Sequence, residues 1–337
     1  MPSPLVTVII PTLDAGEKLE KCLAALAAQT FSDFETVVVD NSGQGLAARL
    51  AVGPRLRRIG NHSNVGFGAA INQGIELAGG EFVCTLNDDT VADARWLEEL
   101  VAACRADPTI GMCASQVRLA SPPSRLDSAG MQIYLDGTSK QRGRLQPAEA
   151  FPSLEEVLFP SACAALYRSA LLRQVGGFDP DFFLYCEDTD LGLRARRAGW
   201  RCLYVPSAIV FHDYSSSAGR ASPAKAFYVE RNRIYTVIKN FPVWIWPLVP
   251  LFALYRYGMH AGALLSGRGL AAEFQQGGEK WWKLVIIVLS ANWQALGKLP
   301  ALLAKRRRAG ESAALSGWAF WRLLRSQSIS SREVAGQ

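Results

Sequence analysis

Short apolar runs that alternate with helix-like segments constrain the fold of this chain more than any other feature. Three runs rich in β-branched residues have the length of buried strands: residues 5–10, 36–39 and 82–86. Segments with apolar residues at helical spacing follow them: residues 17–29, 68–77 and 96–106. Strands that alternate with helices predict an α/β fold with a mostly parallel, Rossmann-like sheet, because parallel strands need crossover connections.

Polar side chains follow each of these predicted strands. They are Thr12, Asp14, Asp40, Asn41, Asp88 and Asp89. Parallel sheets bind ligands at the carboxyl ends of their strands, so we expect these side chains to converge on one ligand site. Further along the chain we expect helices at residues 166–175 and 186–199, and irregular structure around an acceptor site at residues 122–160.

Two adjacent carboxylates end the third strand, in the string Asn87-Asp88-Asp89. Their mutual repulsion makes burial costly, and a divalent cation would remove that cost. Mg²⁺ and Mn²⁺ prefer oxygen ligands and share them with phosphates, so a cation here would stabilise a departing diphosphate. The alternative is a solvated turn or a helix N-cap before Trp96.

A second acidic group, Glu187-Asp188-Thr189-Asp190, follows an aromatic stretch. Desolvation by these aromatic residues would raise a carboxyl pKa towards the range of a general base. Such a base would deprotonate an acceptor hydroxyl. The alternative is the ordinary acidic N-terminus of a helix, since negative charge is favourable there.

Three other groups are weaker signals. Asp40 could accept hydrogen bonds from a base or a ribose, or could form a simple Asx-turn. The turn Asn64-Val65-Gly66-Phe67-Gly68 precedes a helix, where backbone approaches phosphate closely, but a lone GxG is common. His212 follows an apolar string, and a lone histidine of this kind is often structural.

Composition restricts the class of protein. Of 337 residues, 49% are hydrophobic and 20% charged, which excludes a disordered chain. The net charge of +6 suits an anionic partner, whether nucleic acid, phosphorylated ligand or lipid. Seven scattered cysteines without a CxxC pair predict buried, reduced thiols. The first residues lack the pattern of a signal peptide, so we expect the active domain in the cytoplasm.

The character of the chain changes after residue 240. Two apolar runs, at residues 241–255 and 284–296, contain tryptophans but fall short of a spanning helix, and basic residues 305–308 follow them. We therefore expect a catalytic domain at 1–240 and a helical, peripheral membrane-associating region at 241–337, resting on anionic lipid. The alternatives are a tail packed on the core, a homodimer contact and a spanning segment.

With these motifs assembled, the chain resembles glycosyltransferase family 2, in its bacterial rhamnosyltransferase-like branch. The strings VTVIIPTLDAG, VVVDNS, NVGFGAAINQGI, LNDDT, GGFDPDFFLYCEDTDLGLR and VFHD occur in order and span about residues 5–240. The resemblance implies a GT-A type nucleotide-diphospho-sugar transferase fold and an inverting mechanism.

The resemblance, with the strand-end argument, also implies roles for single residues. Donor-binding residues would be Pro11, Thr12, Asp14, Asp40, Asn41, Asn64, Gly66, Asn87 and Asp88. Asp89 and His212 would bind Mg²⁺ or Mn²⁺, and Asp188 would be the general base. Residues on the acceptor side would be Glu187, Asp190, Arg231 and Arg233. Asn87 replaces the first acid of a strict DxD triplet, as is usual in this branch.

The expected reaction moves a sugar from a nucleotide-diphospho-sugar to a polyprenyl-linked saccharide of the cell envelope, at the cytoplasmic membrane face. L-rhamnose from dTDP-rhamnose is the first candidate, and UDP- and GDP-sugars are alternatives. A non-catalytic nucleotide-sugar-binding scaffold is the rival interpretation. A nucleic-acid-binding protein is disfavoured, because the basic residues gather beside tryptophans and apolar runs.

Overall fold

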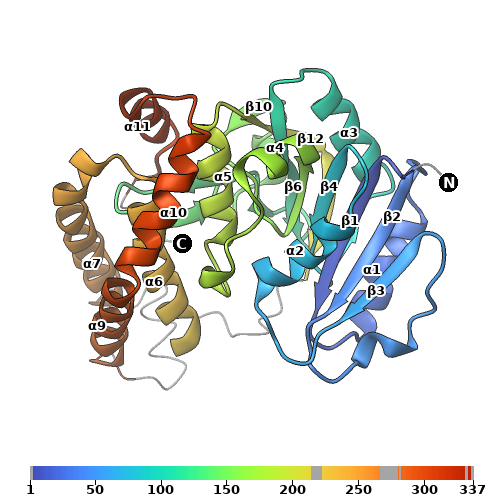
Figure 1. The fold of residues 1–337 in the computed structure, drawn as a ribbon, viewed down its shortest axis with the longest axis horizontal. Coiled ribbons are helices and arrows are strands. Elements are labelled where there is room, and N and C mark those ends of the chain that lie inside the picture. Colours follow the sequence, from blue (N-terminus) through green and yellow to red (C-terminus); the bar gives the residue numbers. More distant parts are fainter. Residues whose placement is uncertain (1–2, 214–221, 266–279, 281, 331–332, 335–337) are drawn as a thin grey trace. The chain divides into compact units, whose positions relative to one another are not determined.

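The computed structural model describes residues 3–213, 222–265, 280, 282–330 and 333–334. The chain forms two compact units (Figure 1). The first contains residues 1–131 and 141–214, and the second contains residues 132–140 and 215–337. The expected boundary at residue 240 differs from this division, because residues 223–240 belong to the second unit.

The first unit is built on a ten-stranded sheet. Eight strands follow one another in space: β10 (Glu155–Val157), β12 (Arg201–His212), β6 (Ile110–Leu119), β11 (Ala164–Arg168), β4 (Phe82–Leu86), β1 (Val6–Thr12), β2 (Phe34–Asp40) and β3 (Leu56–Gly60). Two more strands, β5 (Thr90–Ala92) and β7 (Leu126–Ser128), pair with β12 and β6.

The part of this sheet around β1 matches the sequence-based expectation. Strand β1 lies between β2 and β4 and is parallel to both, and β2 is parallel to β3. The expected helices follow these strands: α1 (Glu17–Ala27), α2 (Phe67–Leu77) and α3 (Trp96–Arg105). Helix α1 shows why, since its apolar positions Leu19, Cys22 and Leu26 form one buried face.

The other part of the sheet corrects the expectation of a mostly parallel arrangement. Strand β11 is antiparallel to both of its neighbours, β4 and β6, so the sheet is mixed. The helix predicted at residues 166–175 was wrong in its first three residues, because only α4 (Ser169–Val175) is helical. Residues 164–167 are all buried, and a short, uniformly apolar run lacks the periodicity that separates a strand from a helix.

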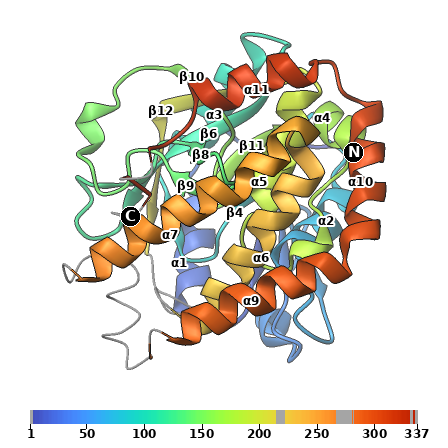
Figure 2. The same cartoon turned by 90° about the vertical axis from the view of Figure 1, so that its left-hand side faces the viewer.

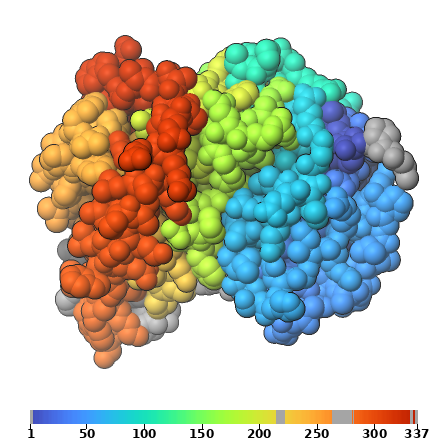
Figure 3. Space-filling view, in the orientation of Figure 1, coloured from blue at the N-terminus to red at the C-terminus, as the bar shows by residue number. Residues whose placement is uncertain are grey.

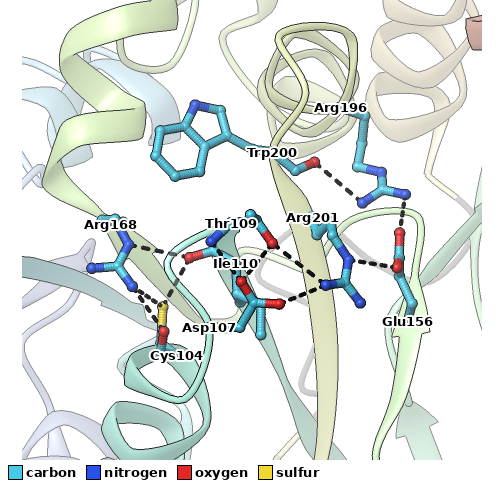
Figure 4. A network of polar contacts seen from close by, with 9 residues as sticks. All are labelled: Cys104, Asp107, Thr109, Ile110, Glu156, Arg168, Arg196, Trp200 and Arg201. Carbon is cyan, nitrogen blue, oxygen red and sulfur yellow. Dashed lines mark hydrogen bonds and ion pairs between the residues drawn. The ribbon is translucent and has the colours of Figure 1, made fainter.

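Charged side chains fix the far edge of the sheet (Figure 4). Arg201, at the start of β12, contacts Asp107 Oδ2 at 2.7 Å and Glu156 Oε2, on β10, at 2.9 Å. Glu156 also pairs with Arg196 of α5 (Glu187–Arg197). These ion pairs attach α5 to the sheet beneath it. The intervening residues 122–160 are mostly irregular, as expected, with only short strands and one 3₁₀ turn, η2 (Ala148–Ala150).

The core of the first unit is apolar and reduced. The Trp96 indole is fully buried and donates a hydrogen bond to Ser115 Oγ at 2.8 Å. All seven cysteines are free and buried, which confirms the interpretation of their spacing. Burial raises the pKa of Cys22 to about 12, so its thiol stays protonated at neutral pH.

The second unit is helical. It contains α6 (Pro223–Asn240), η4 (Val243–Leu248), α7 (Val249–Leu265), α9 (Trp282–Gly297), α10 (Leu299–Glu311) and α11 (Gly317–Ser326). Part of a hairpin, formed by β8 (Met131–Ile133) and β9 (Ser139–Gln141), completes it. Residues 266–279 of the expected membrane-associating region lie outside the described residues.

A buried ion cluster ties these segments together. Arg256 on α7 contacts Asp136 Oδ2 of the hairpin at 2.6 Å and Glu230 Oε2 of α6 at 2.9 Å. Arg233 also pairs with Glu230, and Tyr257 donates to it at 2.6 Å. Burial raises the pKa of Glu230, but Arg233 and Arg256 outweigh that effect and lower it to about 2. The cluster explains why α6 belongs to this unit.

None of the described helices alone has both the length and the hydrophobicity needed to cross a membrane. Helices α9 and α10 satisfy both requirements only as a pair, and a bend of 65° separates them.

Candidate active site

The carboxyl ends of β1 and β4 meet as the strand order predicts. Thr12, the last residue of β1, donates a hydrogen bond to Asp88 Oδ2 at 2.6 Å, just past β4. Its hydroxyl also accepts from the Ala15 N–H at 3.0 Å. Burial, with the nearby charges of Asp89 and Asp14, raises the pKa of Asp88 to about 6 against the effect of the Thr12 bond. Acidic side chains are therefore gathered at this edge of the sheet, where burial partly removes them from water.

Two other expected donor residues lie in β1 or just after it. Pro11 is half-buried within β1, opposite Val39 of β2, and its ring leaves β1 without one backbone donor. Asp14 is exposed just beyond it, and its Oδ1 accepts from the Gly16 N–H at 3.0 Å.

Asp40 ends β2 directly opposite Thr12, yet its carboxylate serves its own loop. Oδ1 accepts from the Ser42 N–H at 3.0 Å and from the Ser42 hydroxyl at 2.6 Å, and Oδ2 accepts from the Ala47 N–H at 2.7 Å. Burial opposes ionisation, but these hydrogen bonds outweigh it and lower the pKa of Asp40. The geometry is that of an Asx-turn, which was the alternative interpretation of this residue.

Asn41 holds the glycine turn in place. Its side-chain N–H₂ donates to Asn64 Oδ1 at 2.9 Å, and its Oδ1 accepts from the Val65 N–H at 3.0 Å. Asn64 Oδ1 in turn accepts from the Gly66 N–H at 2.9 Å. Asn41 and Asn64 therefore shape the backbone at the start of α2, which the sequence had connected with donor binding.

Gly66 is required by a close backbone approach. Its φ is +89°, and a Cβ at this position would lie 2.5 Å from the carbonyl oxygen of Phe183. The neighbouring Phe67 N–H donates to the same oxygen at 2.8 Å. The turn before α2 therefore packs directly on the segment that precedes α5, and only glycine allows it.

That segment is strained. Phe183, Tyr185 and Cys186 all have positive φ, between 61° and 67°, although none is glycine. Residues held in such conformations cluster at active sites and ligand clamps, where surrounding structure enforces them. The strained segment leads directly into Glu187 and Asp188 at the start of α5.

The two acids that begin α5 lie in a desolvated environment. Glu187 is 6% exposed, and its Oε2 has no hydrogen-bond partner in the described part of the chain. Burial and the neighbouring Asp188 raise its pKa to about 8. Burial also raises the pKa of Asp188, partly offset by N–H donors from Ala162 at 3.3 Å and Thr189 at 2.7 Å.

A short backbone segment brings the two acidic groups together. The Ala162 N–H donates to Asp188, and the next carbonyl, that of Cys163, accepts from the Asn87 N–H at 2.8 Å. Residues about a hundred positions apart in sequence thus share neighbouring anchors. The proposed base and the Asn87-Asp88-Asp89 string therefore lie at one site.

Asp89 and His212 also meet. His212 Nε2 lies 3.2 Å from Asp89 Oδ1, and its Nδ1 lies 2.9 Å from Asp127 Oδ2. Burial lowers the pKa of His212, but Cys163, Asp127 and Asp89 outweigh that effect and raise it well above the usual value. Asp127, in β7, was missed by sequence analysis, because a lone acid in a segment expected to be irregular carries no distinguishing pattern.

The site contains donor types that a divalent cation accepts. The Asp89 carboxylate and the His212 imidazole converge, and the buried Asn87 Oδ1, two residues before Asp89, has no hydrogen-bond partner among the described residues. No group of three or more His, Cys, Asp or Glu side chains surrounds a metal position in the described residues. The protein would therefore supply part of the coordination, and phosphate oxygens and water would complete it, as is usual for Mg²⁺.

Three residues expected on the acceptor side have structural contacts instead. Asp190 is fully buried and pairs with Arg194 at 2.9 Å, whose guanidinium donates to the carbonyls that end α4. Arg233 belongs to the buried ion cluster of the second unit. Arg231 is also buried there, where it donates to Gln294 at 2.9 Å. These contacts give each of the three a structural role, and their expected place on the acceptor side stays a prediction.

Comparison with known proteins decides the family. Residues 2–234 match the model described as "Glycosyltransferase like family 2". The chain belongs to glycosyltransferase family 2. The expectation from the ordered motifs is thereby confirmed, and the protein is a glycosyltransferase.

Two named relatives are each similar to more than half of this chain. A Mycobacterium tuberculosis protein named N-acetylglucosaminyl-diphospho-decaprenol L-rhamnosyltransferase is 30% identical over 265 residues, covering 70% of this chain and 84% of the relative. O-antigen biosynthesis protein RfbC of Myxococcus xanthus is 28% identical over 229 residues, which cover 64% of this chain and 18% of that protein.

Solved structures show the family's fold. Mannosyltransferase PcManGT from Pyrobaculum calidifontis, in complex with GDP-Man and Mn²⁺, matches with a TM-score of 0.51 and 20% identity over 94% of this chain and 88% of its own. GalNAc-T7 with UDP, GalNAc and Mn²⁺ matches with a TM-score of 0.57 and 16% identity over 70% of this chain and 48% of its own. At these identities the likeness shows a GT-A-like α/β fold.

Proposed function

We propose that this family 2 enzyme is an inverting, metal-dependent glycosyltransferase that transfers L-rhamnose from a nucleoside diphosphate to a hydroxyl of a lipid-linked saccharide. The observation that carries the proposal is the shared anchor of its two acidic groups. Asp188 binds the Ala162 N–H, and Asn87 binds the adjoining Cys163 carbonyl, so a base stands beside a candidate cation and diphosphate site.

The acids at the start of α5 divide their roles by protonation. A pKa of about 8 favours the protonated form of Glu187 at neutral pH, so one negative charge is expected on the pair, and we assign it to Asp188 as the proposed base. Desolvation raises the pKa of Asp188 as well, which strengthens it as a proton acceptor. Asp188 would take the proton of the acceptor hydroxyl as that oxygen attacks the anomeric carbon.

Asp89 and His212 would hold the cation, and Asp127 would fix the imidazole by accepting from its other nitrogen. A bound divalent cation supplies positive charge that stabilises the departing diphosphate. Thr12 holds Asp88 at the same edge, beside the donor sugar. Attack from the face opposite the leaving group inverts the anomeric configuration through an oxocarbenium-like transition state, and one base is sufficient.

The proposed sugar, acceptor and cellular location are inferred from a relative and not from the geometry of the site. The 30% identical relative is named for L-rhamnosyl transfer to a decaprenol-linked N-acetylglucosamine. We take dTDP-rhamnose as the first donor and a polyprenyl-diphosphate-linked saccharide as the acceptor class. Such an acceptor would place the reaction at the cytoplasmic face of the plasma membrane.

A donor screen tests the proposal most directly. dTDP-, UDP- and GDP-sugars would be compared by thermal shift with Mn²⁺, and the product made on a lipid-linked N-acetylglucosamine acceptor would be analysed by NMR. We expect stabilisation by dTDP-rhamnose and a product of inverted configuration. Donor binding without transfer to any acceptor would favour the non-catalytic scaffold, and retention would exclude the mechanism.

The base and the cation have separate tests. Asp188→Asn should keep donor binding and lose turnover by roughly two to four orders of magnitude, the usual effect of removing a general base. Glu76→Gln, which changes an exposed acid on α2, is the matched control and should be silent. Excess chelator should abolish transfer, and Mn²⁺ should restore it. Normal turnover in Asp188→Asn, or in chelator, would contradict the respective role.

A further inference from the structure

One helix of the second unit exposes an unusual apolar surface. Six large apolar side chains of α9 are between 44% and 79% exposed: Trp282, Val285, Ile286, Leu289, Trp293 and Leu296. The last five follow Trp282 by three, four, seven, eleven and fourteen residues. This spacing places all six on one side of the helix, which we call the α9 face. Soluble surfaces carry large apolar residues singly, so a continuous row marks an interaction surface.

The opposite side of α9 is already occupied by protein. Ala291 and Ala295 are at most 1% exposed, and α9 packs beside α6 (Figure 2). Gln294 accepts a hydrogen bond from Arg231 of α6 at 2.9 Å. Helix α9 is therefore held lengthwise against its own unit, with its apolar face outward.

The α9 face continues as a groove towards α6. A hollow of about 610 Å³ is lined by Phe227 of α6 and by Leu289, Ser290, Trp293 and Gln294 of α9. Most of this lining is apolar. The exposed surface is thus wider than a single row of side chains.

Basic residues predominate around this face. Lys280 and Lys283 stand at the start of α9 and Lys298 at its end, and no acid occurs from residue 280 to residue 310, although Glu279 and Glu311 flank this stretch. Arg307 and Arg308 are exposed on α10. The orange-red segment that includes α9 and α10 forms part of the face shown in Figure 3. Arg306 differs, because it donates to the carbonyls of residues 238 and 241 and so holds α10 in place.

We propose that the α9 face docks flat on an anionic lipid bilayer. Tryptophans near the ends of an apolar row suit the headgroup level of a membrane, and lysines at both ends complement anionic lipid. A spanning role does not fit, because α9 has 16 residues and its inner side packs on protein. A symmetric dimer through this face would bring lysine-bearing ends of two copies together, so like charges would oppose it.

Vesicle flotation tests this docking without any sugar donor or acceptor, so its outcome is independent of the proposed reaction. The full chain would be mixed with vesicles of neutral phosphatidylcholine, with or without phosphatidylglycerol. We expect binding to anionic vesicles more than tenfold stronger than to neutral ones, weakening with salt, since anionic lipid attracts basic residues near its surface and salt screens that attraction.

A double variant, Leu289→Ser with Trp293→Ser, should lose vesicle binding by more than tenfold while its melting temperature stays unchanged, because both side chains are exposed. The matched control is Val52→Ser with Leu154→Ser, which removes two side chains of the first unit that are 59% and 57% exposed. That control should bind vesicles like the wild type.

Three outcomes would overturn the proposal. One is wild-type flotation of the α9 variant, and another is equal binding to neutral and anionic vesicles. The third is a dimer in light scattering that fails to float and that the α9 variant converts to a monomer, which would make a second copy the occupant of this face.

Discussion

Replacing Gly66 by alanine should destabilise the protein and disturb its proposed active site together. Gly66 has φ +89° and ψ 162°, a region that is essentially restricted to glycine and costs other residues about 1–3 kcal/mol. The new Cβ would also lie 2.5 Å from the Phe183 carbonyl oxygen and 2.9 Å from its Cα. Overpacking against backbone adds about 1–3 kcal/mol, so we expect a total loss of about 2–6 kcal/mol.

The same substitution should impair catalysis, because relief of the clash moves the strained segment before α5. That segment positions Asp188, which must meet the acceptor hydroxyl within hydrogen-bond distance. We therefore expect kcat to fall at least tenfold, and further than KM rises. Urea unfolding followed by circular dichroism would measure stability, and steady-state kinetics would measure transfer.

Gly45→Ala is the matched control. Gly45 also has positive φ, at +68°, but no atom lies within 4 Å of its hypothetical Cβ. Gly45→Ala should lower the free energy of unfolding only by the cost of placing alanine in the left-handed conformation, about 1–2 kcal/mol, and should leave kcat unchanged. Equal loss of stability in the two variants would refute the reasoning, because it would show that the contact with Phe183 contributes nothing.

Three further predictions concern buried charges. The pKa of Glu187 is about 8 in the folded state, against a usual 4.5. Its protonated carboxyl therefore stabilises the fold fully below pH 4.5, and this stabilisation is lost as pH rises through 8. In Glu187→Gln, urea unfolding should therefore show less decline between pH 5 and 9. Asp127→Asn should weaken Mn²⁺ binding by about 10–100-fold in calorimetric titration, because His212 loses its orienting partner. Arg256→Ala should lower the free energy of unfolding by about 3–5 kcal/mol, since it leaves Asp136 buried without that cation.

Each of these has a control and a contrary result. Glu76→Gln should leave the pH profile unchanged, and an identical profile in Glu187→Gln would contradict the protonation of Glu187. Asp107→Asn should leave Mn²⁺ affinity intact, and unchanged affinity in Asp127→Asn would show that His212 needs no support. Arg105→Ala removes an exposed pair worth under about 1 kcal/mol, and a similarly small loss in Arg256→Ala would show that the cluster tolerates an unpaired carboxylate.

Sequence reasoning recovered three of the parallel strands and missed other strands for identifiable reasons. Strands β1, β2 and β4 are short apolar runs bounded by helical periodicity, which made them recognisable. Strand β3 escaped notice because it is an edge strand with Arg57 and Arg58 in its centre. Strand β11 was assigned to a helix because its apolar residues continue into α4 without a change of pattern.

The candidate site was partly predictable. The end of a predicted strand drew attention to Asp88 and Asp89, and the aromatic stretch before Asp188 drew attention to that residue. The connection between them runs through backbone groups of Ala162 and Cys163, which leave no trace in side-chain chemistry. Pattern alone also could not separate acids that face a ligand from those that stabilise a helix end.

The interleaving of the two units has a practical consequence for dissecting this enzyme. The hairpin around Asp136 is encoded inside the catalytic half of the gene, whereas its cationic partners Arg233 and Arg256 come much later. A fragment that stops near residue 214 would keep the aspartate and lose both arginines. Protein engineers who wish to swap the helical unit between homologues would have to transplant two separate stretches of coding sequence.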